Sequence, residues 1–376
     1  MKDGCEIKKL GEVCSVLNGL WIGKKEPFVN IGVIRNTNFT KDCKLNLDNV
    51  AYIDAEAKHF ASRKLLVGDI IVEKSGGSEK QPVGRVVLFD IADGDYSFSN
   101  FTSALRVKDS VDLISKYLHK CLYAHYLRGE TYKLQSKTTG LHNLDMKGYL
   151  NLPIPLPSIA EQEKIVAELN CLSGIIEKKK QQLKELDARA QSIFYEMFGD
   201  PIENDKGWEV KKLGDICTLK AGKAIKANEL SDVASDNLYP CFGGNGIRGY
   251  IEKVSHHNQY PIIGRQGALC GNVVLSTKEF YATEHAVVVQ PVVEMNIYWS
   301  YYTLMYMNLN RLAQGVAQPG LSVGRVNQED FILPPLTLQQ EFASKIEAIE
   351  KQKELIKQSI QETETLFNSR MDYYFN

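Results

Sequence analysis

Two long stretches of the chain place apolar residues in alternating steps of four and three. In the first stretch these positions are Ile165, Leu169, Leu172, Ile176, Leu183, Leu186 and Ile193. In the second they are Phe342, Ile346, Ile349, Ile356, Ile360 and Phe367. An apolar period of 3.5 residues over about five heptads is typical of coiled-coil helices. The pattern predicts two long helices that pair through these seam positions, with an amphipathic helix packed on its own domain as the alternative for each.

Lysines interrupt both seams. Lys179 and Lys353 occupy positions where the step pattern calls for an apolar side chain. A polar residue in a coiled-coil seam fixes the register of the two helices at some cost in stability. We therefore expect these two lysines to select one alignment of the helices.

Shorter runs of β-branched residues precede each long helix and alternate with glycine-rich turns. Predicted strands cover 68–73, 84–89, 272–276 and 286–290. Two aromatic-rich segments, 113–123 and 298–307, have the composition of helices, and their tyrosines are expected to pack in and around a core. The coarse prediction is a mixed α and β domain before each long helix.

An internal repeat relates the two halves of the chain. Residues 6–19 return as residues 209–222, with Leu10 and Leu213 in register at an offset of 203. Further on, Thr139-Gly140-Leu141 resembles Pro319-Gly320-Leu321, and the proline-rich closures align Gln162 with Gln340 at an offset of 178. Similar ends around dissimilar middles indicate two globular units of one plan with different surfaces.

The predicted fold class is therefore α+β. Two mixed α/β domains form a pseudo-two-fold repeat and are joined by two long antiparallel helices that form a coiled coil. The expected boundaries are a first domain at 1–157, a first helix at 158–198, a second domain at 199–335 and a second helix at 336–376.

Composition and charge narrow the function classes. The 376 residues carry 45 Lys and Arg against 46 Asp and Glu, a net charge of −1, which argues against a protein that coats DNA without specificity. The sequence has neither an apolar run of membrane-spanning length nor a secretion signal at its start, so we expect a cytoplasmic protein without membrane contact. Its eight cysteines include no C-x-x-C pair, and we predict no metal site.

Motifs for catalysis are weak. Gly244–Gly249 matches G-x-G-x-x-G but lacks the helix and the acidic residue of a dinucleotide site. Asp69, Glu73 and Lys74 resemble a nuclease metal set only in composition, and charges at a strand edge are the preferred interpretation. Neither a phosphate-binding loop nor the [DNS]-P-P-[YFW] loop of adenine methyltransferases occurs. We predict no catalytic residue in this chain.

Glycine-rich polar loops are the remaining candidates, because glycine lets backbone approach phosphate while Arg, Gln and Asn read base edges. In the first repeat the candidate DNA-binding residues are Lys74, Ser75, Ser78, Lys80, Gln81, Arg85, Lys137, Thr138 and Thr139. In the second they are Asn245, Arg248, Arg265, Gln266, Gln314 and Gln318. Polar turns without a ligand are the alternative for each residue taken alone.

These features together resemble a known family. Two repeats that open with K-K-L-G-[DE] and close with a proline-rich segment before a long helix are similar to the specificity subunits of type I restriction-modification enzymes. The most specific stretches are 207–215 and 156–169. The first repeat has Cys5 where the second has Trp208, and the second closure has Gln339-Gln340 for Glu161-Gln162.

The resemblance implies a subunit that binds double-stranded DNA and carries no chemistry itself. Each domain would read one half of an asymmetric, bipartite target. Two adenine-N6 methyltransferase subunits would dock on the helices, and restriction motor subunits would join the complex. S-adenosylmethionine, ATP and magnesium would then be bound by those partners rather than by this chain. The alternatives are a coiled-coil scaffold with two protein- or peptide-binding heads and, more distantly, a nuclease.

Overall fold

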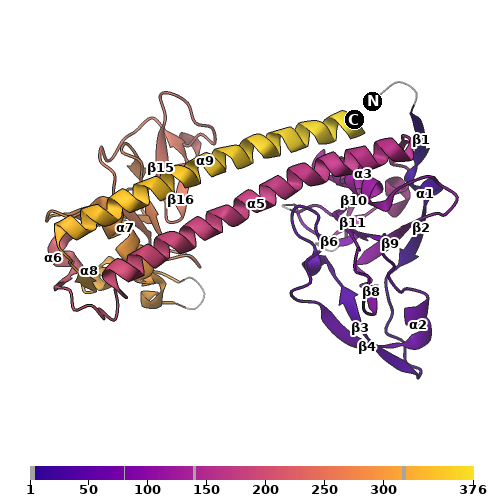
Figure 1. The fold of residues 1–376 in the computed structure, drawn as a ribbon, viewed down its shortest axis with the longest axis horizontal. Helices are drawn as coiled ribbons and strands as arrows, with labels where there is room; N and C mark the ends of the chain where they lie inside the picture. Colours follow the sequence, from indigo (N-terminus) through magenta and orange to yellow (C-terminus); the bar gives the residue numbers. More distant parts are fainter. Residues whose placement is uncertain (1–4, 80, 139–140, 316–318) are drawn as a thin grey trace. The chain divides into compact units, whose positions relative to one another are not determined.

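The computed structural model describes residues 5–79, 81–138, 141–315 and 319–376. Two compact units divide the chain (Figure 1). The first combines Met1–Lys178 with Ser359–Asn376, and the second is Lys179–Gln358. Each unit therefore contains part of both long helices together with one globular domain.

The described residues of the first unit contain three sheets of three or four strands and one two-stranded sheet. Its elements are β1 (Glu6–Lys9), α1 (Leu10–Val13), β2 (Cys14–Asn18), β3 (Phe28–Ile34), β4 (Ala51–Glu56), α2 (Ala57–Ala61), β5 (Ile70–Glu73), β6 (Ser75–Gly77), β7 (Val86–Leu88), β8 (Tyr96–Phe98), β9 (Thr102–Val107), α3 (Ser115–Leu127), β10 (Gln135–Thr138), β11 (Leu141–Leu144), α4 (Met146–Tyr149) and β12 (Pro153–Leu156). The larger sheets have the strand orders β2-β9-β5-β7, β4-β3-β8 and β10-β11-β6, and β1 pairs with β12.

The second unit repeats this topology. Its elements are β13 (Val210–Lys212), α6 (Leu213–Ile216), β14 (Cys217–Ala221), β15 (Tyr239–Gly243), β16 (Gly246–Ile251), β17 (Pro261–Gly264), β18 (Val273–Leu275), β19 (Tyr281–Ala282), β20 (Ala286–Pro291), α7 (Ile297–Tyr306), α8 (Val323–Asn327) and β21 (Asp330–Ile332). The orders β14-β20-β17-β18 and β16-β15-β19, with β13 against β21, match those of the first unit strand for strand. The third sheet is reduced to single bridges from Gly320 to Gln266 and Gln314.

The β-branched runs form the buried strands because both of their faces are covered. Ile70, Ile71 and Val72 of β5 are fully buried, as are Ile262 and Ile263 of β17. The predicted aromatic helices are present as α3 and α7, and their tyrosines and Trp299 pack in the core as expected. The α+β class predicted from the sequence is confirmed.

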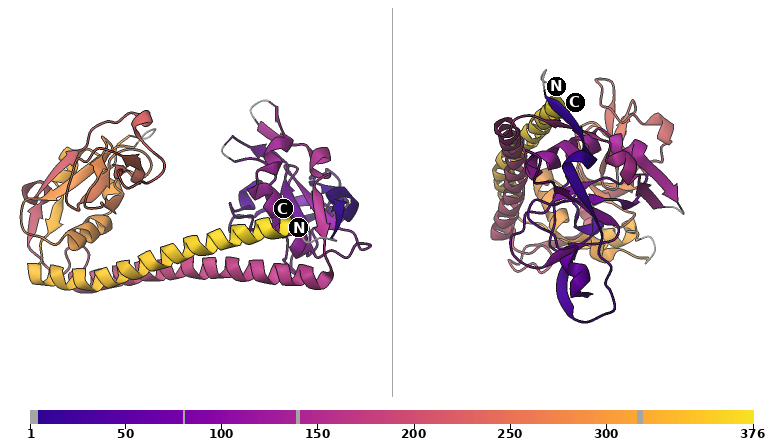
Figure 2. Two further views of the ribbon diagram at one scale, coloured as in Figure 1. Left: turned by 90° about the horizontal axis from the view of Figure 1, so that it is seen from above. Right: turned by 90° about the vertical axis from the view of Figure 1, so that its right-hand side faces the viewer.

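Two 40-residue helices follow the domains, α5 (Ile159–Phe198) and α9 (Leu336–Phe375). They run antiparallel within each unit. In the second unit Asp187 contacts Lys353 and Met197 contacts Lys345, so that numbers rise on one helix as they fall on the other. In the first unit the end of α9 lies beside the start of α5, where Arg370 pairs with Glu168 (Figure 2).

Burial follows the predicted seam over most of both helices. The buried positions are Ile165, Leu169, Ile176, Phe342, Ile346, Ile349, Ile360 and Phe367, and the partly buried ones are Leu172, Leu183, Leu186, Ile193 and Ile356. At the C-terminal end of each helix the buried face moves by one residue. Phe194 and Phe198, and likewise Met371 and Phe375, are more buried than the heptad pattern predicts, because there the helices pack on the globular domain.

Lys353 occupies its seam position as a paired charge. Its ammonium lies 2.7 Å from Asp187 Oδ1 on α5 and 2.8 Å from Glu350 Oε1 on its own helix. The ion pair to Asp187 joins the two helices of the second unit at one register, which agrees with the role expected for a polar seam residue.

Hydrogen bonds at the starts of α5 and α9 correct the alignment of the two repeats in the proline-rich segments that precede these helices. Gln162 accepts from Ile114 N and donates to Pro157 O, both at 2.9 Å. The residue with the same bonds in the second repeat is Gln339, which accepts from Asn296 N at 2.9 Å and donates to Pro334 O at 2.8 Å. The expected equivalence of Gln162 with Gln340 was therefore wrong by one residue, because the second closure has two adjacent glutamines and only the first of them is buried.

Candidate nucleic-acid interface

The residue that follows the central strand occupies the same position in both units. In the first unit Lys74 follows β5, donates its backbone N–H to Phe101 O at 3.0 Å, and accepts from Leu144 N at 2.8 Å. In the second unit Arg265 follows β17, donates to His285 O at 3.1 Å, and accepts from Leu321 N at 2.8 Å. A cation therefore stands at an equivalent point of each domain.

The same bonds correct a second sequence alignment. Leu321 was expected to correspond to Leu141, which follows Thr139 and Gly140. Because Leu144 and Leu321 make the same bond to the residue after the central strand, Leu144 is the true equivalent. Both of these leucines are buried, whereas Leu141 is exposed.

Backbone segments approach closely around Arg265. A Cβ added at Gly264 would lie 2.0 Å from Gly244 O, so only glycine permits this contact. The approach brings the turn between β15 and β16, which carries Asn245, beside the end of β17. Asn245 Oδ1 accepts from Asn272 Nδ2 at 3.4 Å across the two turns. The G-x-G-x-x-G match thus lies in a β-hairpin and not between a strand and a helix.

Three buried polar atoms near Arg265 have no hydrogen-bond partner in the described part of the chain. They are Arg265 Nε, Glu284 Oε2 and His285 Nδ1. His285 Nε2 lies 3.2 Å from Glu284 Oε1, so each of these two side chains has one paired and one unpaired polar atom. Unpaired buried donors and acceptors cost free energy, which makes this cluster a place where a polar ligand would be stabilised.

The first unit has different side chains at the equivalent place. Lys74 is half-buried, and burial lowers the pKa of its ammonium. No hydrogen bond or ion pair to Lys74 Nζ is found among the residues that the structure describes. Ser75, the next residue, donates its hydroxyl to Asn143 Oδ1 at 2.6 Å, and its carbonyl accepts from Asn36 Nδ2 at 2.6 Å. Asn100, which precedes Phe101, is exposed.

The structure brings the predicted loops together within each unit. β6 contains Ser75 and pairs with β11, which in turn pairs with β10, the strand of Lys137 and Thr138. In the second unit the bridges of Gly320 place Gln266 beside Gln314. Ser78 and Gln81 form an exposed turn closed by the Gln81 N to Ser78 Oγ bond at 3.2 Å. Arg248 lies on β16 and is exposed, while Lys80, Thr139 and Gln318 lie outside the described residues.

The structure corrects the prediction that Arg85 contacts DNA. Its side chain is 6% exposed and forms a bidentate ion pair with Glu73, at 2.8 Å from Nε and 3.0 Å from Nη2. Nη1 donates to Phe39 O at 2.9 Å. The guanidinium is thus enclosed in the protein and does not face a DNA ligand, so we remove Arg85 from the candidate contacts.

The two carboxylates of the suspected nuclease set, Asp69 and Glu73, are also held in ion pairs with arginines. Asp69 is buried and accepts from Arg106 Nε at 2.8 Å and Nη2 at 2.7 Å, while Glu73 pairs with Arg85. These carboxylates are therefore not strand-edge charges, as the sequence suggested, but halves of two internal ion pairs. The described residues contain no group of three or more metal-ligating side chains.

The sequence did not single out Asn36, Asn100, Asn143 or Glu284. Each is a common polar residue without a motif around it. For Asn36, Asn100 and Glu284 the signal available was a position just before or after a β-rich run, where side chains gather at the end of a sheet, whereas Asn143 lies within β11.

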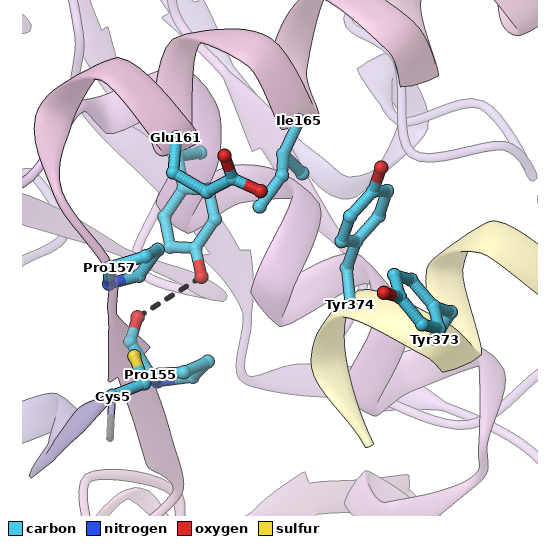
Figure 3. A pocket seen from close by; sticks show the side chains of 8 residues that line it. Cys5, Pro155, Pro157, Glu161, Ile165, Tyr373 and Tyr374 are labelled. Carbon is cyan, nitrogen blue, oxygen red and sulfur yellow. Dashed lines mark hydrogen bonds between the residues drawn. The ribbon is translucent and has the colours of Figure 1, made fainter. Parts of the chain in front are cut away.

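A separate pocket lies in the first unit, where α5 and α9 meet (Figure 3). Figure 3 shows Tyr374 of α9 beside Ile165 of α5, with Pro155 and Pro157 on the opposite wall. Tyr117 donates its hydroxyl to Pro155 O at 3.1 Å. The pocket is lined mostly by apolar and aromatic groups and lies beside the helices. It is therefore a different surface from the polar strand ends, by which we mean the residues that follow β5 and precede β9 in the first unit and those that follow β17 and precede β20 in the second.

The sequence model of the type I restriction modification DNA specificity domain matches residues 2–188 and 205–365. The chain belongs to this family. The resemblance seen in the sequence is thus confirmed, and the two matched regions agree with the two repeats. The description of the family names DNA specificity, as the resemblance implied.

Relatives with recorded functions are specificity subunits. The EcoprrI specificity subunit of Escherichia coli is 38% identical over 209 residues, which cover 52% of this chain and 52% of that protein. The MjaIX specificity subunit of Methanocaldococcus jannaschii is 24% identical over 317 residues, covering 72% of this chain and 69% of the relative. The alignment to the first relative thus spans about half of its length.

Solved structures share the fold. The type I restriction-modification S subunit from M. genitalium superposes with a TM-score of 0.60 at 14% identity, over 99% of this chain and 96% of that one. A chain from a study of complex assembly and conformational transition of the type I system superposes with a TM-score of 0.57 at 17% identity, over 100% of this chain and 98% of that one.

Among the described residues, no helix is long and apolar enough to cross a membrane.

Proposed function

We propose that this chain is the specificity subunit of a type I restriction-modification complex and reads a bipartite, asymmetric DNA target. Each globular domain would contact one half-site through the polar strand ends described above. The observation that carries the proposal is that two domains of one topology place different side chains at equivalent positions. Lys74 corresponds to Arg265 by its backbone bonds, and their surroundings differ. Unlike domains of one plan suit a target whose halves differ in sequence.

The two long helices would set the spacing between the half-sites and hold the partner subunits. We propose adenine-N6 methyltransferase subunits on the helices and ATP-dependent restriction subunits in the larger complex, with S-adenosylmethionine, ATP and magnesium bound by those partners. Exposed apolar side chains on the helices, among them Ile175, Leu355 and Leu366, support a docking role. Partners that surround the DNA would also supply the basic surface that a chain of net charge −1 lacks. The complex would act in the cytoplasm, where its DNA target lies.

Methylome sequencing tests the proposal. The chain is expressed with its methyltransferase subunit in cells free of other adenine methylation, and modified adenines are mapped. The expected result is one split motif with methyladenine in both halves. A continuous motif, or methylation that needs the methyltransferase but not this chain, would contradict the proposal. In binding assays, a duplex with the split motif should bind and a scrambled duplex should not, which excludes the peptide-binding scaffold.

The spacer role has its own experiment. Seven residues are inserted into both helices, between Lys178 and Lys179 and between Gln358 and Ser359, which are the boundaries of the compact units. Two helical turns add about 10 Å, or about three base pairs of duplex. The variant should methylate the same two half-sites with a longer unread spacer. Insertion into one helix alone is the control, and it should abolish methylation because the seam loses its register.

A further inference from the structure

We propose that Arg265 and Glu284 together read one G·C base pair in the half-site bound by the second domain. This inference rests on the proposed DNA-specificity function and names the residues and the base pair at that site. Arg265 would donate to the guanine O6 and N7 acceptors, and Glu284 would accept from the cytosine N4 amino group. Both pairings are favoured side-chain contacts in the major groove.

The two side chains come from adjacent strands of one sheet. Arg265 follows β17 and Glu284 lies two residues before β20, and β17 pairs with β20. The Arg265 N to His285 O bond ties the two segments together at 3.1 Å. A residue with donor groups and a residue with acceptor groups are therefore placed on neighbouring segments at the end of the sheet.

The charges favour a base edge over a phosphate. A phosphate beside Arg265 would also approach the Glu284 carboxylate, and two negative charges at short range repel each other. A guanine edge presents acceptors to the guanidinium, and its partner cytosine presents a donor to the carboxylate. Unlike the enclosed Arg85, Arg265 and Glu284 are only partly buried, so a guanidinium donor and a carboxylate acceptor can meet this ligand.

His285 is a positioning residue in this scheme. Its Nε2 lies 3.2 Å from Glu284 Oε1, and it holds the carboxylate through that contact. Substitution of His285 should therefore affect specificity only while Glu284 is present.

The first domain carries Lys74 and Asn100 at the corresponding points. Asn100 is the second residue before β9, as Glu284 is the second residue before β20. Lysine and asparagine have a different donor and acceptor pattern from arginine and glutamate. The same location would thus read different bases in the two half-sites, which gives a physical origin for an asymmetric target.

Methylome sequencing of variants tests the inference. Arg265→Ala should relax one G·C position in one half of the motif, with discrimination at that position reduced about 5- to 150-fold, the range of one bidentate contact. Glu284→Met, which keeps a side chain of similar length and removes both acceptor oxygens, should relax the same position. Lys253→Ala is the charge control, since Lys253 pairs with Glu229 on an exposed surface of the same unit, and it should leave the motif unchanged.

The outcomes distinguish a failure of the base-pair inference from a failure of the proposed DNA-specificity function. A uniform loss of methylation in Arg265→Ala with the motif intact would make Arg265 a phosphate contact and overturn the inference. An unchanged motif in Glu284→Met would overturn it as well. Both results leave a split wild-type motif, and hence the proposed function, standing. Thermal unfolding of each purified variant verifies that the fold is retained, and His285→Ala in the Glu284→Met background should cause no further change in the motif.

Discussion

The guanidinium of Arg85 and the carboxylate of Glu73 form a bidentate ion pair inside the first unit, with both side chains nearly inaccessible to water. Val72 and Val86 are opposed in the β5–β7 ladder, so Glu73 and Arg85 follow as cross-strand neighbours. A buried pair of this kind is costly to break, since removal of one partner leaves the other charge without compensation.

Arg85→Met should therefore destabilise the chain by about 3–5 kcal/mol. Chemical denaturation of the purified protein measures the change. The double variant Arg85→Met/Glu73→Leu should recover most of the loss because it removes both charges. A stable single variant, or a double variant no better than the single one, would contradict this account of the pair.

The two buried glutamines at the starts of α5 and α9 should contribute similar amounts to the free energy of unfolding. Gln162→Leu and Gln339→Leu each remove an acceptor and a donor that serve backbone groups, and each should cost about 1–3 kcal/mol. Gln340→Leu is the matched control, because Gln340 is exposed and should tolerate the change. If the Gln340 variant proved as unstable as the Gln339 variant, the corrected alignment of the repeats would be wrong.

His119 should make the stability of the first unit depend on pH. Burial, with a smaller effect of the nearby Lys120 charge, lowers the pKa of His119 to about 4. The unfolded chain takes up this proton near pH 6.5 and the folded chain does not, so the free energy of unfolding falls as the pH drops from about 6.5 to about 4. The loss attributable to this residue is at most about 3 kcal/mol.

Denaturation at several pH values measures this effect. His119→Gln keeps a donor for Cys43 O, which lies 3.1 Å from His119 Nε2. The variant should show a shallower decline of stability between pH 6.5 and pH 5 than the parent protein. Equal slopes in the two proteins would assign the acid sensitivity to other groups.

Exposed leucines on α9 should contribute to partner binding and not to folding. Leu355 and Leu366 are 59% and 50% exposed. Leu355→Glu and Leu366→Glu should leave the unfolding temperature nearly unchanged and weaken association with the methyltransferase subunit, because each places a charge in an apolar contact. Gln352→Glu, a change on an exposed polar position of the same helix, serves as control in the same pull-down or calorimetric titration. Undiminished association of both leucine variants would move the docking surface elsewhere.

Periodic and repeated features of the chain were readable from the sequence. The apolar steps from Ile165 onward predicted α5, and the repeat around Leu10 and Leu213 predicted two domains of one topology. These properties depend on local spacing, which a sequence displays directly. The helix ends near Phe198 and Phe375 departed from the heptad pattern because tertiary contacts with the globular domains, and not the helix pairing, decide burial there.

Individual contacts at the strand ends were less predictable. Arg85 has the chemistry of a DNA contact, and only its pairing opposite Glu73 across two strands shows that it is internal. Glu284 and His285 stand next to a valine-rich strand without a motif, and their proximity to Arg265 follows from the order of strands in the sheet. Strand order is a long-range property that one sequence does not display.

The division of the first unit into two chain segments has a consequence for biosynthesis. Residues 359–376 belong to the same compact unit as residues 1–178, and the whole second unit is encoded between them. During translation the first unit must therefore remain without its last helical segment until the second unit has emerged from the ribosome. Its apolar positions that meet Phe367, Met371 and Phe375 stay uncovered for that interval, which makes the nascent first unit a substrate for chaperones.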